Sequence, residues 1–308
     1  MQYTVKAEDS GKTVKELITE LLQPSAKMLK YLKYREDGIL LGGTRVTVRA
    51  TVQEGDLLEL SLLDPQDARG PEAVDLPLTI LYEDADLVVP SKAGNMPTHP
   101  SRDHYRDTVA NALAYRYRNE ATPFVFRPIN RLDRETSGLL LVARNKLAAG
   151  RLTKSMQAGE IRKTYLAVLS ADTLEDAGEI DLPLHRSAAS IIVREVCSPE
   201  TPDAEPSRTR FRVLARRNGY ALAEAQPLTG RTHQLRVHFA SLGCPIVGDT
   251  LYGSADPRIG RQALHARSLS FPHPSGQERL TLTAPLPEDF ADLIGAIFSE
   301  MKGVFDEP

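Results

Sequence analysis

The segment best suited to chemistry places one carboxylate among cations. Asp133 has Arg131 two residues before it and Arg134 directly after it. Neighbouring positive charges favour the ionised form of a carboxylate, which is the form that a nucleophile requires. The stretch 127–138 is rich in turn-forming and small polar residues and leads into the apolar run 139–142, so we expect a reactive loop at the end of a rigid strand. The alternative is a solvated charged turn with a surface ion pair.

Two other stretches could supply cations and an aromatic ring. At 228–238 the chain leaves a hairpin and enters a helix, which would put Arg231 beside a helix N-terminus, where anions bind. A capped helix with solvated arginines is the alternative there. In the strand 162–167, alternation sends Lys163 and Tyr165 to one face, although a lone strand tyrosine usually packs half-buried in a sheet.

The net charge of the chain hides two positive windows. The 308 residues hold 38 Lys and Arg against 41 Asp and Glu, a net −3 that argues against a nucleic-acid partner. However, residues 127–165 hold nine basic residues against three acidic ones, and residues 208–236 hold seven against one. Each window therefore carries +6, and the rest of the chain carries −15. If the windows meet in the fold, they form a basic cleft around Asp133 that suits a polyanion.

Other common chemistries find no motif in the chain. GxxxxGK[ST], GxGxxG, HExxH and GxSxG are absent, which argues against nucleotide hydrolysis, dinucleotide redox chemistry, zincin proteolysis and α/β-hydrolase chemistry. The histidines and the two cysteines, Cys197 and Cys244, have no metal-ligand spacing, so we expect neither a metal nor a cofactor. No apolar run approaches the ~20 residues that span a bilayer and the N-terminus lacks a signal-peptide pattern, so we expect a cytoplasmic protein.

Hydrophobic periodicity predicts an α+β fold with a mostly antiparallel sheet. Helices are expected at 14–22, 26–32, 108–117, 145–158 and 232–242. Strands are expected at 38–41, 44–48, 57–62, 78–84, 87–89, 138–143, 161–169, 209–216 and 220–226, the last two joined by an Asn-Gly hairpin turn. Residues 1–63 are expected to form a small αα-β unit, the polar stretch 64–75 a linker, and residues 76–308 the large domain.

Taken together, these residues resemble the RluA family of RNA pseudouridine synthases over about residues 76–293. The segment 130–140, NRLDRETSGLL, is similar to the family's HRLDxxTSGLL signature, with Asn130 in place of the usual histidine. Supporting collinear matches lie at 80–84, 96–100, 163–165, 230–238, 248–253 and 264–266. The loop 92–95 reads Lys-Ala-Gly-Asn instead of the usual Lys-Pro-Ala-Gly, and Asn95 can adopt the left-handed conformation that glycine supplies.

The resemblance implies a pseudouridine synthase fold, with a central mixed, mostly antiparallel sheet flanked by helices and loops. The site residues that it implies are Asp133 as the catalytic aspartate, Arg131 as its motif partner, Tyr165 stacking near the target base, and Arg231 pairing with the aspartate. The RNA-binding residues that it implies are Arg134, Lys163, Thr232, His233, Gln234 and Arg236. The N-terminal unit looks like an S4-type RNA-binding module, with Lys27 and Lys30 as RNA contacts on its second helix.

The expected function is isomerisation of specific uridines in structured RNA to pseudouridine by Asp133, without a cofactor or metal. Ribosomal RNA is the first choice of substrate and transfer RNA the second, and we expect a monomer with no obligate protein partner. Two alternatives remain open. One is a non-catalytic RNA-binding or ribosome-assembly protein on the same fold. The other is a glycosidase with a carboxylate pair, for which Glu135 is the nearby second acid.

Overall fold

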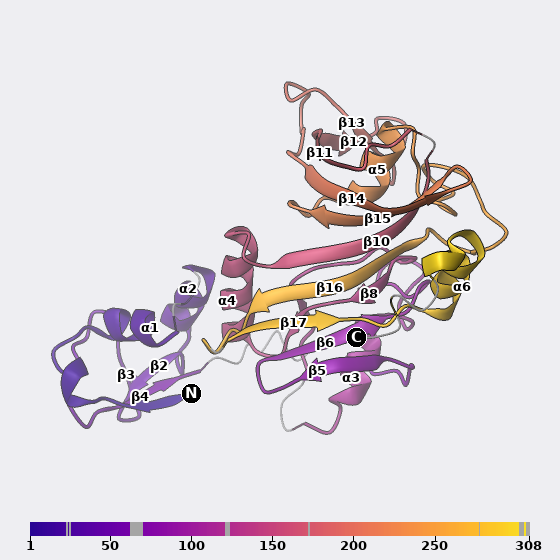
Figure 1. Ribbon diagram of the computed structural model, residues 1–308. Helices are drawn as coiled ribbons and strands as arrows, with labels where there is room; N and C mark the ends of the chain where they lie inside the picture. Colours follow the sequence, from indigo (N-terminus) through magenta and orange to yellow (C-terminus); the bar gives the residue numbers. More distant parts are fainter. Residues whose placement is uncertain are drawn as a thin grey trace.

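The chain folds into an N-terminal unit and a large unit with separate apolar cores (Figure 1). The computed structural model describes residues 1–308 except 23, 25, 62–69, 121–123, 172, 277, 302–304 and 306–308. Half of the expected linker 64–75 lies outside the described residues, and its described end, 70–75, contains no helix or strand.

The N-terminal unit packs two helices against a small sheet. Its elements are β1 (Gln2–Thr4), the 3-10 helix η1 (Ala7–Asp9), α1 (Val14–Leu22), α2 (Ala26–Tyr34), β2 (Ile39–Leu41), β3 (Thr44–Arg45) and β4 (Leu57–Leu60). The helical spacing of the apolar residues in α1 buries that face in the core of the unit, as the sequence predicts. The antiparallel sheet has the order β1-β4-β2-β3. Strand β1 is missed because three residues are too few to show an alternating pattern.

A mixed sheet of eleven strands forms the centre of the large unit (Figure 1). Its strands are β5 (Thr79–Glu83), β6 (Leu87–Lys92), β7 (Arg127–Pro128), β8 (Ser137–Leu139), β9 (Val142–Ala143), β10 (Arg162–Ser170), β11 (Ala177–Asp181), β14 (Arg208–Arg217), β15 (Tyr220–Pro227), β16 (Leu264–Pro272) and β17 (Arg279–Thr283). The order is β11-β14-β15-β10-β16-β8-β6-β9-β7, with β17 paired to β16 and β5 to β6. Between the described strands, β16 with β8 is the parallel pairing and the rest are antiparallel. The expected mostly antiparallel α+β fold is confirmed.

Helices and a short second sheet flank the large sheet. They are α3 (Val109–Arg116), α4 (Lys146–Gln157), the hairpin β12 (Leu184–Arg186) with β13 (Arg194–Val196), α5 (Gln234–Ser241), α6 (Glu288–Ile297) and the 3-10 helix η3 (Ser299–Met301). Asn145 caps α4 by accepting a hydrogen bond from the Ala148 amide (2.8 Å), as its sequence position predicts. The β14–β15 turn has positive φ at both Asn218 (49°) and Gly219 (79°), which confirms the predicted hairpin. No helix in the described part of the chain is long and apolar enough to cross a bilayer.

The expected continuous strand 138–143 is divided into β8 and β9. Gly138 has φ of 109°, and a Cβ on it would lie 2.3 Å from the Ala266 carbonyl oxygen of β16. Glycine therefore permits the close parallel approach of these two strands. Leu140 and Leu141 between β8 and β9 are fully buried, so the expected burial is correct even though the strand is interrupted. The chain that leads into β8 is the segment that carries Asp133.

Helix α4 joins the two units. Arg151 donates one hydrogen bond to the Pro274 carbonyl of the large unit (2.7 Å) and another to the Leu21 carbonyl of the N-terminal unit (3.2 Å). Leu147 packs against the N-terminal core, and Figure 1 shows α2 beside α4. The C-terminal end of α4 lines the cleft described below, so the helix connects the N-terminal unit to the candidate site.

Candidate active site

Asp133 lies in the loop between β7 and β8, with its side chain 19% exposed. The Thr136 amide donates to the Asp133 carbonyl (3.1 Å) and closes a turn in the loop. At the start of the loop, the Asn130 Oδ1 accepts from the Leu141 amide (2.7 Å) and its Nδ2 donates to the Leu139 carbonyl (3.4 Å). Asn130 thus fastens the loop to the chain around β8 in the place where the resemblance expects histidine.

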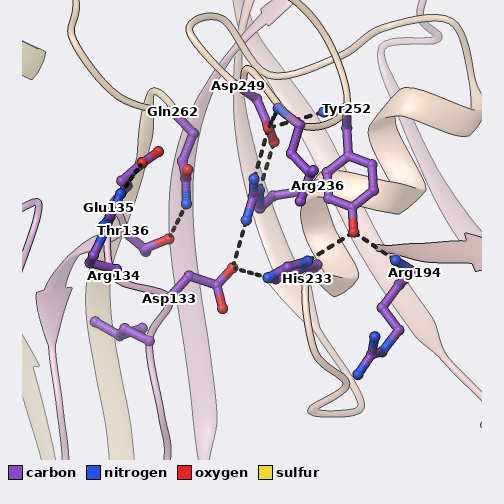
Figure 2. Close-up of polar contacts among 12 residues, drawn as sticks. Asp133, Arg134, Glu135, Thr136, Arg194, His233, Arg236, Asp249, Tyr252 and Gln262 are labelled. Carbon is purple, nitrogen blue, oxygen red and sulfur yellow. Dashed lines mark hydrogen bonds and ion pairs between the residues drawn. The ribbon is translucent and has the colours of Figure 1, made fainter. Parts of the chain in front are cut away.

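Two side chains from the start of α5 approach the Asp133 carboxylate (Figure 2). The Arg236 Nη1 lies 3.4 Å from the Asp133 Oδ2, and the His233 Nε2 lies 3.9 Å from the same oxygen. His233 adopts a left-handed conformation (φ 58°) directly before α5. Burial lowers the pKa of His233 and the positive charge of Arg236 lowers it further, while Asp133 opposes the shift. A neutral imidazole beside the carboxylate follows near pH 7.

Asp249 holds Arg236 in place from the opposite side. The Arg236 Nε and Nη2 lie 2.7 and 2.8 Å from the two oxygens of Asp249, which is fully buried. Burial lowers the pKa of Arg236, but the hydrogen bonds to Asp249 outweigh that effect and raise it. The Tyr252 hydroxyl contacts the His233 Nδ1 (2.8 Å) and accepts from the Arg194 amide (2.9 Å). Both partners of Asp133 are therefore fixed by neighbours before any substrate is present (Figure 2).

The expected ion pair between Arg231 and Asp133 is wrong. The Arg231 guanidinium instead contacts a Glu205 oxygen (3.1 Å), and Arg236 takes the place next to Asp133. The reason is local, because α5 begins at Gln234 rather than at the expected residue 232. The Arg231 amide is bonded to the Gln234 Oε1 (3.0 Å) in the preceding turn. Arg231 therefore lies in the loop before α5 and contacts Glu205, whereas Arg236 lies in the first turn of α5 and contacts Asp133.

Strand β10 contributes Tyr165 and Lys163 to the same cleft, as their expected shared face predicts. Burial raises the pKa of Tyr165, and the negative charge of Asp133 raises it further. The phenol therefore stays protonated over the physiological range. Burial lowers the pKa of Lys163.

The two positive windows meet in one cavity of about 840 Å³. Both windows contribute cations to its wall, namely Arg131, Arg162, Lys163, Arg231 and Arg236. Asp133 is the one carboxylate among the described residues that line it. The local charge count, rather than the net charge of the chain, therefore gives the character of the cleft.

Three further residues are expected to bind RNA, namely Thr232, Gln234 and Arg134. Thr232 lines the cleft. Gln234 also lines the cleft, and its amide nitrogen donates to the Arg208 carbonyl (2.8 Å) and the Thr209 hydroxyl (3.0 Å) of β14, so it supports the turn; its contact with RNA stays a prediction. Arg134 turns to Glu135 (3.2 Å).

The two lysines assigned to the N-terminal unit both belong to α2. Lys30 is not among the described residues that line the cavity. The side chain of Lys30 is exposed, and that of Lys27 lies outside the described residues. These two positions stay a prediction for a separate RNA contact.

The described residues show neither a metal centre nor a second carboxylate beside Asp133 in the cleft. Within the described ranges, no three His, Cys, Asp or Glu side chains are grouped so as to hold a metal ion. Glu135 pairs with Arg134, and Figure 2 shows its carboxylate turned away from that of Asp133. The carboxylate pair that a glycosidase needs is therefore not assembled here.

Sequence reasoning missed Lys92, which is 1% exposed beneath the catalytic loop. Its Nζ donates to three backbone carbonyls, those of Ala93 (2.9 Å), Met96 (2.8 Å) and Arg134 (2.8 Å). Burial lowers the pKa of Lys92 to about 7, and the charge of Arg261 contributes to the shift. The match at 92–95 was a signal for this residue, but only the fold shows that it reaches the loop of Asp133.

Comparisons with known proteins identify the family of the chain. Residues 86–241 match the family model described as RNA pseudouridylate synthase. The uncharacterized RNA pseudouridine synthase YjbO of Bacillus subtilis is 38% identical over 282 residues, which cover 92% of this chain and 98% of the relative. The ribosomal large subunit pseudouridine synthase D of Haemophilus influenzae is 32% identical over 324 residues, covering 98% and 96%. Among solved structures, human RNA pseudouridylate synthase domain containing 1 has a TM-score of 0.57 at 31% identity, covering 68% of this chain and 84% of that one.

Proposed function

The chain belongs to the RNA pseudouridylate synthase family and is an RNA pseudouridine synthase, and from this premise we propose that Asp133 carries its chemistry. One observation supports the proposal: among the described residues that line the cleft, Asp133 is the one carboxylate and is accompanied by several cations. A reaction at the sugar carbon of a nucleotide needs an anion where positive charge develops or a bond forms. Asp133 is the described residue of the cleft that can supply it.

The reaction is an isomerisation that leaves the atomic composition of the uridine unchanged. The bond between N1 and C1′ breaks, the uracil turns, C5 bonds to C1′, and the proton on C5 is released while N1 takes one up. Asp133 assists departure of the uracil, by attack on C1′ or by stabilising the positive charge that develops there. Arg236 and His233 lie beside its carboxylate in the cleft, where Arg236 favours its ionised form and His233 contacts it at longer range. Tyr165 supports the extruded base as a neutral phenol, and the sequence of bond changes requires no cofactor.

The cations of the cleft differ in how far they are already paired. Arg231 and Arg236 have carboxylate partners. For Arg131, Arg162 and Lys163 no ion pair is formed with any described residue. We infer that these three receive phosphates of the RNA, because no carboxylate of the protein has to be displaced when they bind one. Phosphate contacts also offset the few kcal/mol needed to extrude the uridine.

Large-subunit ribosomal RNA is the proposed substrate, and transfer RNA is the second candidate. The support is the similarity to the ribosomal large subunit pseudouridine synthase D of Haemophilus influenzae over nearly the full length of both chains. A separate N-terminal unit on α4, close to the cleft, suits a large structured RNA. We propose that this unit is an S4-like RNA-binding module. Single turnovers on transcripts of both RNA classes decide between them, and faster modification of transfer RNA would overturn the ribosomal assignment.

The role of Asp133 is tested by tritium release from RNA that contains 5-tritiated uridine. Asp133→Asn is expected to slow release by at least about 10³-fold, as removal of a principal catalytic group does, while RNA affinity by filter binding is retained. Asp176→Asn is the matched control, since Asp176 also pairs with an arginine (3.0 Å) but is 93% exposed and does not line the cleft. Release at the wild-type rate from Asp133→Asn would refute the assignment.

A further inference from the structure

The backbone of the catalytic loop is held from outside by buried polar side chains. Four of them reach consecutive parts of the loop: Thr98 to the Leu132 carbonyl (2.9 Å), Lys92 to the Arg134 carbonyl (2.8 Å), Arg261 to the Glu135 carbonyl (3.0 Å) and Gln262 to the Thr136 hydroxyl (3.1 Å). Each of the four holding side chains is at least 95% buried. We call them the loop cradle. A loop bound in this way has its position set by the cradle, because each buried hydrogen bond is lost if the loop moves.

Arg261 differs from the rest of the loop cradle because another charged group fixes it. Its Nε and Nη2 lie 2.7 and 2.9 Å from the two oxygens of Asp289, in the first turn of α6. Its Nη1 donates to the Glu135 carbonyl and, at longer distance, to its own neighbour Gln262 (3.2 Å) and to Leu264 (3.4 Å). The bidentate pair defines the plane of the guanidinium. One side chain therefore connects α6 to the residue two positions after Asp133.

The side chain of Arg261 is closely enclosed. A Cβ on Gly94 would lie 2.5 Å from both the Cδ and the Nε of Arg261, so the loop 92–95 passes directly over the arginine side chain. Arg261 is 3% exposed. The arginine is thus enclosed between that loop, α6 and the catalytic loop.

We propose that Arg261, fixed by Asp289, is a positioning residue that sets where the Asp133 carboxylate stands relative to Arg236. The proposal rests on the role assigned to Asp133 above. The contact between Arg236 and Asp133 (3.4 Å) is longer than those between Arg236 and Asp249 (2.7 and 2.8 Å). Asp133 is therefore not held firmly by its own ion pair, and its position depends on the backbone that carries it. A displacement of about 1 Å at a reacting group can cost 10²-fold in rate.

The test compares Arg261→Lys and Asp289→Asn with a matched control. A lysine keeps the charge but cannot span the carboxylate and the Glu135 carbonyl as a guanidinium does, and Asp289→Asn leaves Arg261 present without its anionic anchor. The control is Asp256→Asn, which breaks the ion pair with Arg258 (2.6 Å) in the same stretch of chain but outside the loop cradle. The substrate is tritiated RNA under single-turnover conditions with saturating enzyme, and RNA affinity is measured separately.

Both test variants are expected to lower the single-turnover rate constant about 10- to 100-fold, with RNA affinity within about twofold of wild type because no cradle residue lies in the cation wall of the cleft. The double variant should be little slower than either single one, since both changes break one connection. The control should match wild type. A merely structural role gives a different result, namely a smaller reacting fraction with an unchanged rate constant.

Hydrogen exchange of the free protein provides a readout that needs no substrate. The Leu132 amide donates to the Thr98 hydroxyl (3.3 Å) and the Thr136 amide to the Asp133 carbonyl, so both report on the loop. Exchange at these amides should be faster in Arg261→Lys and Asp289→Asn than in Asp256→Asn. Unchanged exchange together with a wild-type rate constant overturns the positioning role. If the loop loosens while Asp133→Asn remains active, the role assigned to Asp133 fails and the positioning of the loop by Arg261 stands.

Discussion

Replacing Asp249 by asparagine tests whether the ion pair behind the site sets both stability and rate. The substitution keeps the shape of the side chain and an oxygen that can accept from the backbone amides of Leu251 (3.0 Å) and Tyr252 (3.2 Å). It removes the negative charge that faces Arg236. The buried guanidinium would then retain Asp133, at 3.4 Å, as its carboxylate partner.

The expected loss of stability follows from the burial of the pair. Two unit charges 2.7 Å apart attract by about 6 kcal/mol at an effective dielectric constant of 20. Removing one member of a buried pair costs about 3–5 kcal/mol. Because asparagine keeps the backbone hydrogen bonds, we expect the lower end, about 3 kcal/mol. For a unit of this size, that corresponds to a fall in Tm of roughly 6–12 °C.

The expected loss of rate has a separate cause. Without the carboxylate of Asp249, Arg236 has Asp133 as its remaining carboxylate partner. The Asp133 carboxylate, which should act at the substrate, then becomes more tightly paired. We expect the single-turnover rate constant to fall about 10- to 100-fold, the range for a misplaced catalytic group. Urea unfolding and tritium release measure the two effects independently, below the lowered Tm.

Asp176→Asn is the control for both measurements. It also removes one carboxylate of an Arg–Asp pair, but on an exposed site, so its effect on the free energy of unfolding should stay within about 0.5 kcal/mol. If Asp249→Asn destabilises the protein by no more than this control and reacts at the wild-type rate, the reasoning from the buried pair is refuted.

Three further results are expected from single substitutions. Tyr165→Phe should leave the shape of the pH–rate profile between pH 6 and 9 unchanged, because burial and Asp133 raise the pKa of Tyr165; loss of an alkaline limb would contradict this. Gly219→Ala should destabilise the protein by about 1–2 kcal/mol, since its φ is 79°, whereas Gly150→Ala in α4, where a Cβ meets nothing within 4 Å, should stabilise it by about 0.5–1 kcal/mol. Burial lowers the pKa of His265 to about 3, whereas the pKa of this histidine in the unfolded chain is the ordinary value of about 6.5. Between these two values the unfolded chain binds the extra proton, so the free energy of unfolding should fall by up to about 1.4 kcal/mol per pH unit as the pH drops toward 3. His265→Asn should flatten this slope in urea titrations, and an unchanged slope would count against the burial of a neutral His265.

Elements with a strong local pattern could be predicted from the sequence. The helix α1 shows one apolar face, α4 has an asparagine cap, and the β14–β15 hairpin has an Asn-Gly turn, and each of the three appears near its expected place. Strand β16 shows no such pattern, because His265 and Arg267 take buried positions in it. Those side chains are accommodated by partners far away in the chain, such as Ser137 for His265 (2.9 Å). A local pattern cannot report such partners.

The candidate site also contains residues that a local sequence pattern can identify and residues that it cannot. Asp133 could be singled out because a carboxylate between two arginines before an apolar strand is visible in the sequence, although its partners in the structure are Arg236 and His233. The choice between Arg231 and Arg236 could not be made locally, since both flank the start of one helix and either could face a carboxylate. It is decided by Asp249, thirteen residues beyond Arg236, which holds that arginine beside Asp133. Burial of a charged pair is a property of the fold, and it selects the arginine.

The charge windows show that pairing, rather than number, gives a surface its affinity for a polyanion. Much of the positive charge of 208–236 lies on β14, where Arg208 and Arg210 both contact Glu179 across the sheet and Arg212 approaches Glu224 (3.7 Å). Those arginines are exposed but already neutralised, so they add little to the field in the cleft. Arg131, Arg162 and Lys163, in contrast, line the cleft and form no ion pair with a described residue. A chain with net charge −3 can therefore present a basic cleft, because Asp133 is the one carboxylate among the described residues that line it.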